Sequence, residues 1–216
     1  MIVLKVGGAA LNANREVDFF AGSFCVVHGA GPQISAEMER AGIPVEFVGG
    51  RRVTSPEAIG IVKRELQRVN ALICDAIGER AVGLMGDEIG LRAERVPELG
   101  LVGNAVPSRP QAVLDVLDEG KIPVVAPLAE GPLNVNADDA AAALAIGLGA
   151  EALVFVSDVD GLILDGEVVG EISADHASAL LAGGTLEGGI VPKLHAALTA
   201  ARGGVAASIG QTAVVA

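Results

Sequence analysis

The sequence predicts an α/β fold, a three-layer αβα sandwich on a mainly parallel sheet. Short apolar segments alternate with helical patterns along the whole chain of 216 residues. This is the order of elements found in parallel sheets that are covered by helices. Hydrophobic residues make up 51% of the chain and aromatic residues only 2%. The core must therefore consist of Val, Leu, Ile and Ala, which is typical of buried parallel strands and Ala-rich helices.

Apolar segments of four or five residues predict the central strands. They cover residues 2–6, 24–28, 81–84, 122–126 and 153–156. Between them, apolar residues at spacings of three and four predict helices. The helices are expected to begin near Pro32, Ser55, Ser108, Asn134, Ser173 and Pro192. The one that begins at Ser55 is the longest, and two short strands close the chain.

Turn residues predict hairpins outside this sheet. Gly49-Gly50 and Asp165-Gly166 each separate two short β-type segments, and two-residue turns of this kind join antiparallel strands. We expect a further small hairpin within residues 91–106. The hairpin at Gly49-Gly50 is predicted to act as a flap.

The net charge limits the classes of binding partner that are expected. The net charge of −12 argues against nucleic acid and anionic membranes. No apolar run approaches the ~18 residues of a membrane span, and no signal peptide precedes the first strand. Cys25 and Cys74 form no CxxC pair and are expected to be reduced thiols. We therefore expect a cytoplasmic protein.

Two lysines are the sharpest candidates for chemistry. Lys5 lies in an apolar strand two residues before Gly7-Gly8, and lysine is rarely buried without a partner. It either faces solvent from an edge strand or points at a phosphate above the glycine turn. Lys193 begins a helix, where the helix dipole disfavours a cation. An anion nearby would explain it, although surface lysines are common. Asp138 is either a simple first-turn acid or the ion-pair partner of both lysines.

Glycine turns supply the complementary groups. Gly29-Ala30-Gly31 follows a strand and enters a helix, so its amides could bind phosphate oxygens; two ordinary tight turns are the alternative. The chain has no GxxxxGK[ST] motif and only half of a GxGxxG motif, which argues against P-loop and dinucleotide sites. His28 is expected to end its strand with structural hydrogen bonds rather than act as a base. No cluster predicts a metal held by the protein.

Six motifs in order resemble the amino acid kinase superfamily, and most closely its acetylglutamate kinase branch. They cover nearly the whole chain. They are Lys5-Val6-Gly7-Gly8, residues 26–34 (VVHGAGPQI), residues 50–54 (GRRVT), residues 134–138 (NVNAD), residues 157–161 (SDVDG) and residues 189–193 (GIVPK). The resemblance implies an ATP-dependent kinase that phosphorylates the side-chain carboxylate of N-acetyl-L-glutamate in arginine biosynthesis.

The resemblance also implies roles for single residues. Lys5 and Lys193 would stabilise the transferred phosphoryl group, and Asp138 would orient them. Gly7 and Gly8 would bind phosphate. The acceptor would be bound by Gly29, Ala30, Gly31, Arg52 and Asn134, with Arg52 rather than Arg51 holding its carboxylate. ATP would be bound by Asp158, Val159, Asp160, Gly161, Leu162, Ile163, Thr185, Leu186 and Glu187, and Mg²⁺ would arrive on the ATP phosphates.

The implied organisation has two lobes that form a homodimer. Residues 1–130 would bind the acyl amino acid and carry the phosphoryl-transfer turns, and residues 131–216 would bind ATP. This chain is a shortened member, with little sequence for a first helix between Gly8 and Phe24. Ala30 replaces a usual glycine, which is harmless only if its φ is ordinary. The alternatives are a sister kinase for carrier-bound aminoadipate or glutamate, and a non-catalytic sensor of amino acids or nucleotides.

Overall fold

The computed structural model describes residues 1–7, 22–156 and 159–216. Its central sheet has eight strands in the order β14-β16-β15-β11-β1-β2-β8-β5. All neighbours are parallel except β15 and β16. The strands are β1 (Ile2–Val6), β2 (Phe24–His28), β5 (Ala81–Met85), β8 (Ile122–Ala126), β11 (Ala152–Val156), β14 (Glu171–Ser173), β15 (Ala206–Ile209) and β16 (Thr212–Val215).

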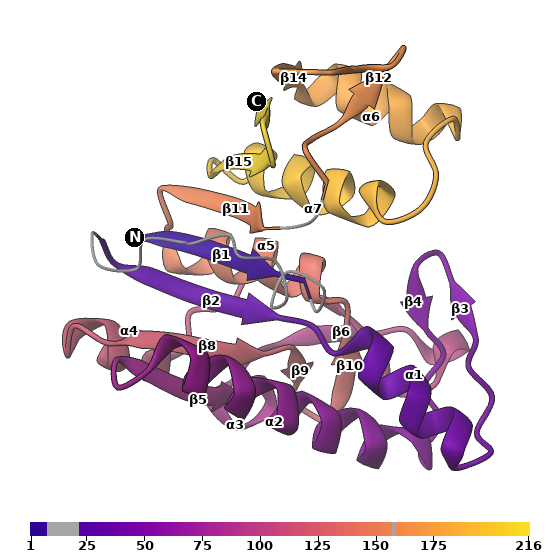
Figure 1. Cartoon of the computed structure of the whole chain (residues 1–216), viewed down its shortest axis with the longest axis vertical. Coiled ribbons are helices and arrows are strands. Elements are labelled where there is room, and N and C mark those ends of the chain that lie inside the picture. Colours follow the sequence, from indigo (N-terminus) through magenta and orange to yellow (C-terminus); the bar gives the residue numbers. More distant parts are fainter. Residues whose placement is uncertain (8–21, 157–158) are drawn as a thin grey trace.

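Helices cover both faces of this sheet and complete the predicted αβα sandwich. Figure 1 shows β1 near the middle of the molecule, between the orange and yellow C-terminal elements and the indigo and magenta N-terminal ones. The helices are α1 (Gly31–Arg40), α2 (Ala58–Ile77), α3 (Gly86–Ile89), η2 (Pro97–Leu99), α4 (Gln111–Asp118), α5 (Ala137–Leu148), α6 (Ala174–Gly183) and α7 (Ile190–Arg202).

The alternation of side chains along β1 separates two hydrophobic cores. Val3 belongs to the core that contains α5 and α7, whereas Leu4 belongs to the core that contains α1 and α2. Because successive side chains of a strand point to opposite faces, Lys5 points to the same face as Val3. The strand thereby directs its one cation toward α5.

Smaller sheets lie beside the central one. A four-stranded sheet has the order β6-β7-β10-β9, and β3 pairs with β4 and β12 with β13 as separate hairpins. The predicted hairpin within residues 91–106 corresponds to the antiparallel pair β6 and β7. These strands are β3 (Phe47–Val48), β4 (Arg51–Arg52), β6 (Ala93–Arg95), β7 (Val102–Ala105), β9 (Leu128–Ala129), β10 (Leu133–Val135), β12 (Ile163–Leu164) and β13 (Glu167–Val168).

The helix ends differ slightly from those expected. Ser55 accepts a hydrogen bond from the Ala58 amide at 3.1 Å, so it caps α2 from outside the regular helix. Helix α4 begins three residues after Ser108, since Pro110 holds an extended conformation at its N-cap. Helix α7 begins two residues before Pro192, which sits in its first turn. A proline is tolerated there because first-turn amides have no partner within the helix.

Candidate active site

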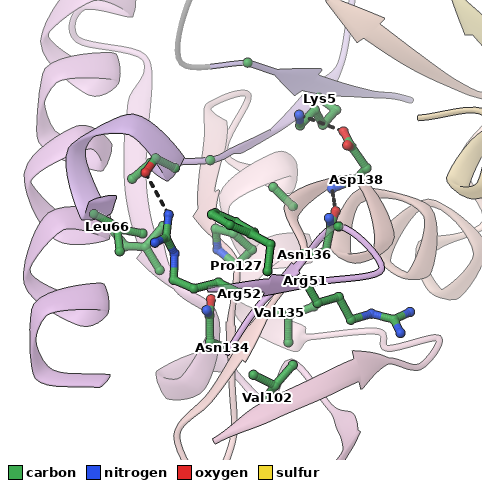
Figure 2. A pocket seen from close by; sticks show the side chains of 18 of the residues that line it. Lys5, Arg51, Arg52, Leu66, Val102, Pro127, Asn134, Val135, Asn136 and Asp138 are labelled. Atoms are coloured by element: carbon green, nitrogen blue, oxygen red, sulfur yellow. Dashed lines mark hydrogen bonds and ion pairs between the residues drawn. The ribbon is translucent and has the colours of Figure 1, made fainter. Parts of the chain in front are cut away.

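The first feature of the site is a buried ion pair between β1 and α5. The Nζ atom of Lys5 lies 2.7 Å from Oδ1 of Asp138, and the two residues are only 7% and 5% exposed. Figure 2 shows the two side chains pointing toward one another. Lys5 is therefore not a solvent-facing edge residue, because β1 is paired on both sides, with β11 and β2.

The N-terminus of α5 positions Asp138. Asn136 precedes the helix with an extended backbone, and its side chain accepts hydrogen bonds from the Asp138 and Asp139 amides at 2.8 and 3.4 Å. This N-cap satisfies amides that have no partner within the helix. The positive end of the helix dipole also favours a carboxylate in the first turn. The capping role of Asn136 was not predicted from the sequence, although an Asn two residues before an acid is a recognisable signal.

Two glycine turns line the cavity that Lys5 and Asp138 also line. Gly7 follows β1, and Gly29 follows β2 with its Cα facing Ala137, where an added Cβ would lie 3.4 Å from the Ala137 Cβ. Ala30 has φ −137° and ψ 30°, which any L-residue can adopt. The Ala in place of a glycine is therefore conformationally harmless. Gly8 lies outside the described residues.

The second lysine approaches from α7. Lys193 lies in the first turn of the helix, and its Nζ donates a hydrogen bond to the Gly189 carbonyl at 3.2 Å. It lines the same cavity as Lys5 and Asp138. The structure thus brings together two cations that are 188 positions apart in the chain.

The flap hairpin supplies two arginines with different environments. Gly49 and Gly50 both have positive φ, 56° and 77°, as a two-residue type I′ turn requires. Arg52 is 6% exposed, and its Nη2 donates to the Gly31 carbonyl at 2.9 Å and to Ser35 Oγ at 2.8 Å. Burial lowers the pKa of Arg52 from its ordinary value. Figure 2 shows Arg51 leaving the hairpin in another direction.

Arg51 instead joins a second charged cluster. Its Nη2 lies 3.4 Å from Oδ2 of Asp139, and Nδ1 of His195 lies 3.9 Å from Oδ1 of the same carboxylate. Burial raises the pKa of Asp139, while Arg51 and His195 oppose that rise. The two consecutive acids of α5 therefore have different partners. Asp138 pairs with Lys5 of β1, whereas Asp139 pairs with Arg51 of the flap and faces α7.

Asn134 is held beside the flap by a chain of hydrogen bonds. Its Nδ2 donates to Thr54 Oγ1 at 2.9 Å, and that hydroxyl donates to the Arg52 carbonyl at 2.9 Å. Thr54 is completely buried. The amide oxygen of Asn134 is thereby oriented by the strand that carries Arg52.

These residues line one cavity of about 340 Å³. Among the predicted site residues, those that line it are Lys5, Gly7, Gly29, Ala30, Gly31, Arg52, Asn134, Asp138 and Lys193. The cations Lys5, Lys193, Arg51 and Arg52 all line this space. The cavity is therefore built to hold anionic groups close together.

The predicted ATP-binding residues are divided. Leu186 and Glu187 line a neighbouring cavity of about 600 Å³ together with Gly50, Arg51 and Pro192. Asp158 lies outside the described residues. Leu162 is fully buried, and its amide donates to Thr212 Oγ1 at 2.8 Å, so its side chain belongs to the core. The remaining ones, Val159, Asp160, Gly161, Ile163 and Thr185, lie on segments at the start of the β12–β13 hairpin and before α7.

His28 has a structural environment, as expected. It is 1% exposed, and its Nε2 lies 3.0 Å from Nδ2 of Asn70, which also donates to the Val124 carbonyl at 2.8 Å. Burial lowers the pKa of His28 to about 4. The imidazole is therefore neutral near pH 7, with Nε2 as the acceptor.

The residues that the structure describes contain no group of three or more His, Cys, Asp or Glu side chains placed to hold a metal ion. None of their helices combines the length and the hydropathy that a membrane crossing requires.

The fold and this cation-lined cavity are typical of small-molecule kinases, and comparisons with known proteins give the family. Residues 1–210 match the model of the amino acid kinase family. The chain belongs to the amino acid kinase family.

Two relatives carry the name of one particular kinase within this family. A protein named acetylglutamate kinase from Nocardioides sp. is 42% identical over 95% of this chain and 75% of its own length. One of the same name from Saccharopolyspora erythraea is 40% identical over 94% of this chain and 77% of its own. The chain is thus shorter than both, as the sequence indicated.

Solved structures agree on the fold. The protein smu.665 from Streptococcus mutans UA159 superposes with a TM-score of 0.87 and 25% identity, over 99% of this chain and 98% of that one. Carbamate kinase from Giardia lamblia superposes with a TM-score of 0.69 and 16% identity, over 99% and 97% of the two chains. The second likeness establishes the fold alone.

Proposed function

We propose that this protein is an acetylglutamate kinase, a transferase that moves the γ-phosphoryl group of ATP to the side-chain carboxylate of N-acetyl-L-glutamate. The product would be an acyl phosphate of arginine biosynthesis. The observation that carries the proposal is the shared cavity in which the Lys5–Asp138 pair and Lys193 face the same space as Arg52.

The reaction requires little beyond charge neutralisation and positioning. A carboxylate oxygen of the acceptor attacks the γ-phosphorus, a new P–O bond forms, and the bond to the β,γ-bridging oxygen breaks as ADP leaves. The acceptor is already ionised at pH 7, so no proton has to be removed. What opposes the reaction is the approach of two anions, which is why placed cations and oriented amides dominate phosphoryl transfer.

Each part of the cavity has a role in this proposal. Lys5 and Lys193 would neutralise the phosphoryl group in flight, and Asp138 would hold the ammonium of Lys5 in place. Gly7 and the turn from Gly29 to Gly31 would donate amides. Arg52 and Asn134 would bind the acceptor, and their mutual orientation through Thr54 supports a joint role.

The donor site would lie at the neighbouring cavity beside α7. The residues near α7 that would bind ATP include Leu186 and Glu187, beside a cavity large enough for phosphates. Two lysines and glycine turns fit an anionic donor. Mg²⁺ would be carried by the ATP phosphates rather than by a set of protein ligands. Residues 1–130 and 131–216 would act as acceptor and ATP lobes, and a cytoplasmic homodimer remains part of the proposal.

A hydroxylamine trap tests the function directly. The protein is incubated with Mg-ATP and one acid at a time, and acyl phosphate is measured as the hydroxamate. N-acetyl-L-glutamate should give product, whereas free aspartate and aminoadipate should give little. A carrier-bound aminoadipate as the better acceptor would favour the sister kinase. Absence of hydroxamate with every acceptor, together with measurable binding of amino acid or nucleotide, would establish a sensor and overturn the kinase proposal.

A further inference from the structure

One exposed aromatic residue of the flap stands against the buried acceptor arginine. Phe47 is 56% exposed in a chain with only five Phe and neither Tyr nor Trp. The centroid of its ring lies 4.6 Å from the Cζ atom of Arg52, within the range of a cation–π contact. Both residues line the cavity of about 340 Å³. Core packing does not account for an aromatic ring that keeps more than half of its surface in solvent.

The type I′ turn determines this contact. Across the hairpin, Phe47 is paired directly with Arg52, and Val48 with Arg51. Directly opposed side chains in an antiparallel pair lie on the same face and contact each other. The next pair along the strands faces the other way, so Val48 and Arg51 lie on the side of Asp139. A shift of one residue in the register would exchange the faces on which Arg51 and Arg52 lie.

The edges of the Arg52 guanidinium are held separately from its face. Nη2 donates to the Gly31 carbonyl and to Ser35 Oγ, and Nη1 lies 3.6 Å from Sδ of Met38. These partners restrain the in-plane position of the group. The Phe47 ring restrains its tilt, because it covers one flat face. Within the described part of the chain, Nε–H and one N–H of Nη1 are left for a ligand.

From this arrangement we propose that Phe47 is a positioning residue for acceptor specificity. Its ring keeps the remaining N–H groups of Arg52 aimed into the cavity, so that an acceptor carboxylate meets them without reorganisation. The inference rests on the proposed function, because it assumes that Arg52 binds a carboxylate of the acceptor. Phe47 would act on acceptor binding rather than on the phosphoryl group, since its ring covers Arg52.

The test compares Phe47→Ala, Phe47→Leu and Phe47→Tyr with wild type in the hydroxylamine assay. Loss of a cation–π contact worth about 0.5 to 2 kcal/mol corresponds to about a 2- to 30-fold change in binding. Phe47→Ala should therefore raise the KM for N-acetyl-L-glutamate about 2- to 30-fold, with kcat and the KM for ATP unchanged within error. Tyr keeps the π-face and should restore the KM. Leu covers the arginine without a π-face and should stay close to Ala.

Val48→Ala is the matched control. Val48 is equally exposed, at 56%, and lies next to Phe47 on the opposite face of the same hairpin, so its truncation should leave all three constants unchanged. An unchanged acceptor KM in Phe47→Ala would overturn the inference. So would a wild-type KM in Phe47→Leu, or a parallel rise in the KM for ATP, which would reveal general loosening of the flap.

Failure of the inference is distinguishable from failure of the proposed function. If wild type forms hydroxamate and the Phe47 variants behave like it, only the role of Phe47 is wrong. If wild type forms no hydroxamate, the kinase proposal is wrong. The role of Phe47 is then tested by calorimetric titration of N-acetyl-L-glutamate into wild type and Phe47→Ala, in place of the hydroxylamine assay. Weaker binding by the variant would then still support the positioning role, whereas equal binding or no binding by wild type would overturn it.

Discussion

The ammonium of Lys5 lies 2.7 Å from the carboxylate of Asp138 across the interface between β1 and α5. Both groups are almost completely buried, and removal of two charges from water is costly unless they are paired. A pair in such a place is weak evidence for stability by itself. The pair lines the same cavity as Arg52, and the proposed function gives it a role toward the phosphoryl group.

Loss of either lysine should reduce turnover far more than binding. Lys193→Ala and Lys5→Arg each remove a point charge from its place, and a contact made mostly in the transition state is worth about 10²- to 10³-fold in kcat. We expect kcat to fall by about that factor while the KM for N-acetyl-L-glutamate changes less than about threefold. Steady-state kinetics measures both constants. A variant of either lysine with nearly wild-type kcat would exclude the proposed role.

The buried pair should respond to single and double substitution in opposite ways. Asp138→Leu leaves the Lys5 ammonium buried without its partner, which typically costs about 3–5 kcal/mol. The double variant Lys5→Met with Asp138→Leu removes both charges and should recover most of that loss. Urea unfolding measures the free energy of unfolding of each. A double variant as unstable as the single one would mean that the ion pair itself is a net source of stability.

The two flap arginines should differ sharply when each becomes lysine. Arg52 donates from one nitrogen to two acceptors and stacks on an aromatic ring, and lysine reproduces neither arrangement. Arg52→Lys should raise the acceptor KM by at least about tenfold. Arg51→Lys keeps a charge beside Asp139 in a partly exposed pair, where the net gain from pairing is small. The acceptor KM of Arg51→Lys should change less than about threefold. A larger rise in Arg51→Lys than in Arg52→Lys would contradict the assignment of Arg52.

Restoring glycine at residue 30 should bring no gain in activity. Ala30 has an ordinary negative φ, so glycine removes no strain there. Ala30→Gly should keep kcat within about twofold of wild type. The stability change should stay within about 1 kcal/mol, because the N-cap preference for glycine and its larger unfolded-state entropy act in opposite directions. A large rise in kcat would show that the substituted alanine impairs this chain.

The buried histidine predicts part of the acid sensitivity. His28 has a folded-state pKa of about 4, below the value near 6.5 in an unfolded chain, so the unfolded state binds more protons between these values. Stability from this group is therefore complete above about pH 6.5 and is lost as the pH falls toward 4. The gap corresponds to about 3 kcal/mol.

Matched variants isolate that contribution. His28→Gln should flatten the decline in the free energy of unfolding between about pH 6.5 and 4, compared with wild type. The exposed His176 lies on α6 and is not part of this network, and His176→Gln should keep the wild-type slope. Identical slopes in all three proteins would show that His28 is not protonated on unfolding in this range.

The local pattern of the sequence was enough to predict much of this protein. Alternation of apolar segments, glycine turns and helical spacings predicted the αβα fold, the strands at residues 2–6 and 24–28, and the hairpin at Gly49-Gly50. These features depend on neighbours in the chain, since propensity, turn conformation and periodicity act over a few residues. The six motifs likewise indicated the family and a short list of site residues.

Only the tertiary structure decided which of those residues meet. The sequence left Lys5 open between a solvent-facing edge position and a position aimed at a phosphate, because the pairing of β1 with β11 joins residues about 150 positions apart. It also left Asp138 as either a helix acid or an ion-pair partner. The contact of Phe47 with Arg52 and the ordinary φ of Ala30 were invisible for the same reason. Burial, strand register and backbone angle are settled by packing between distant segments, and no local pattern encodes them.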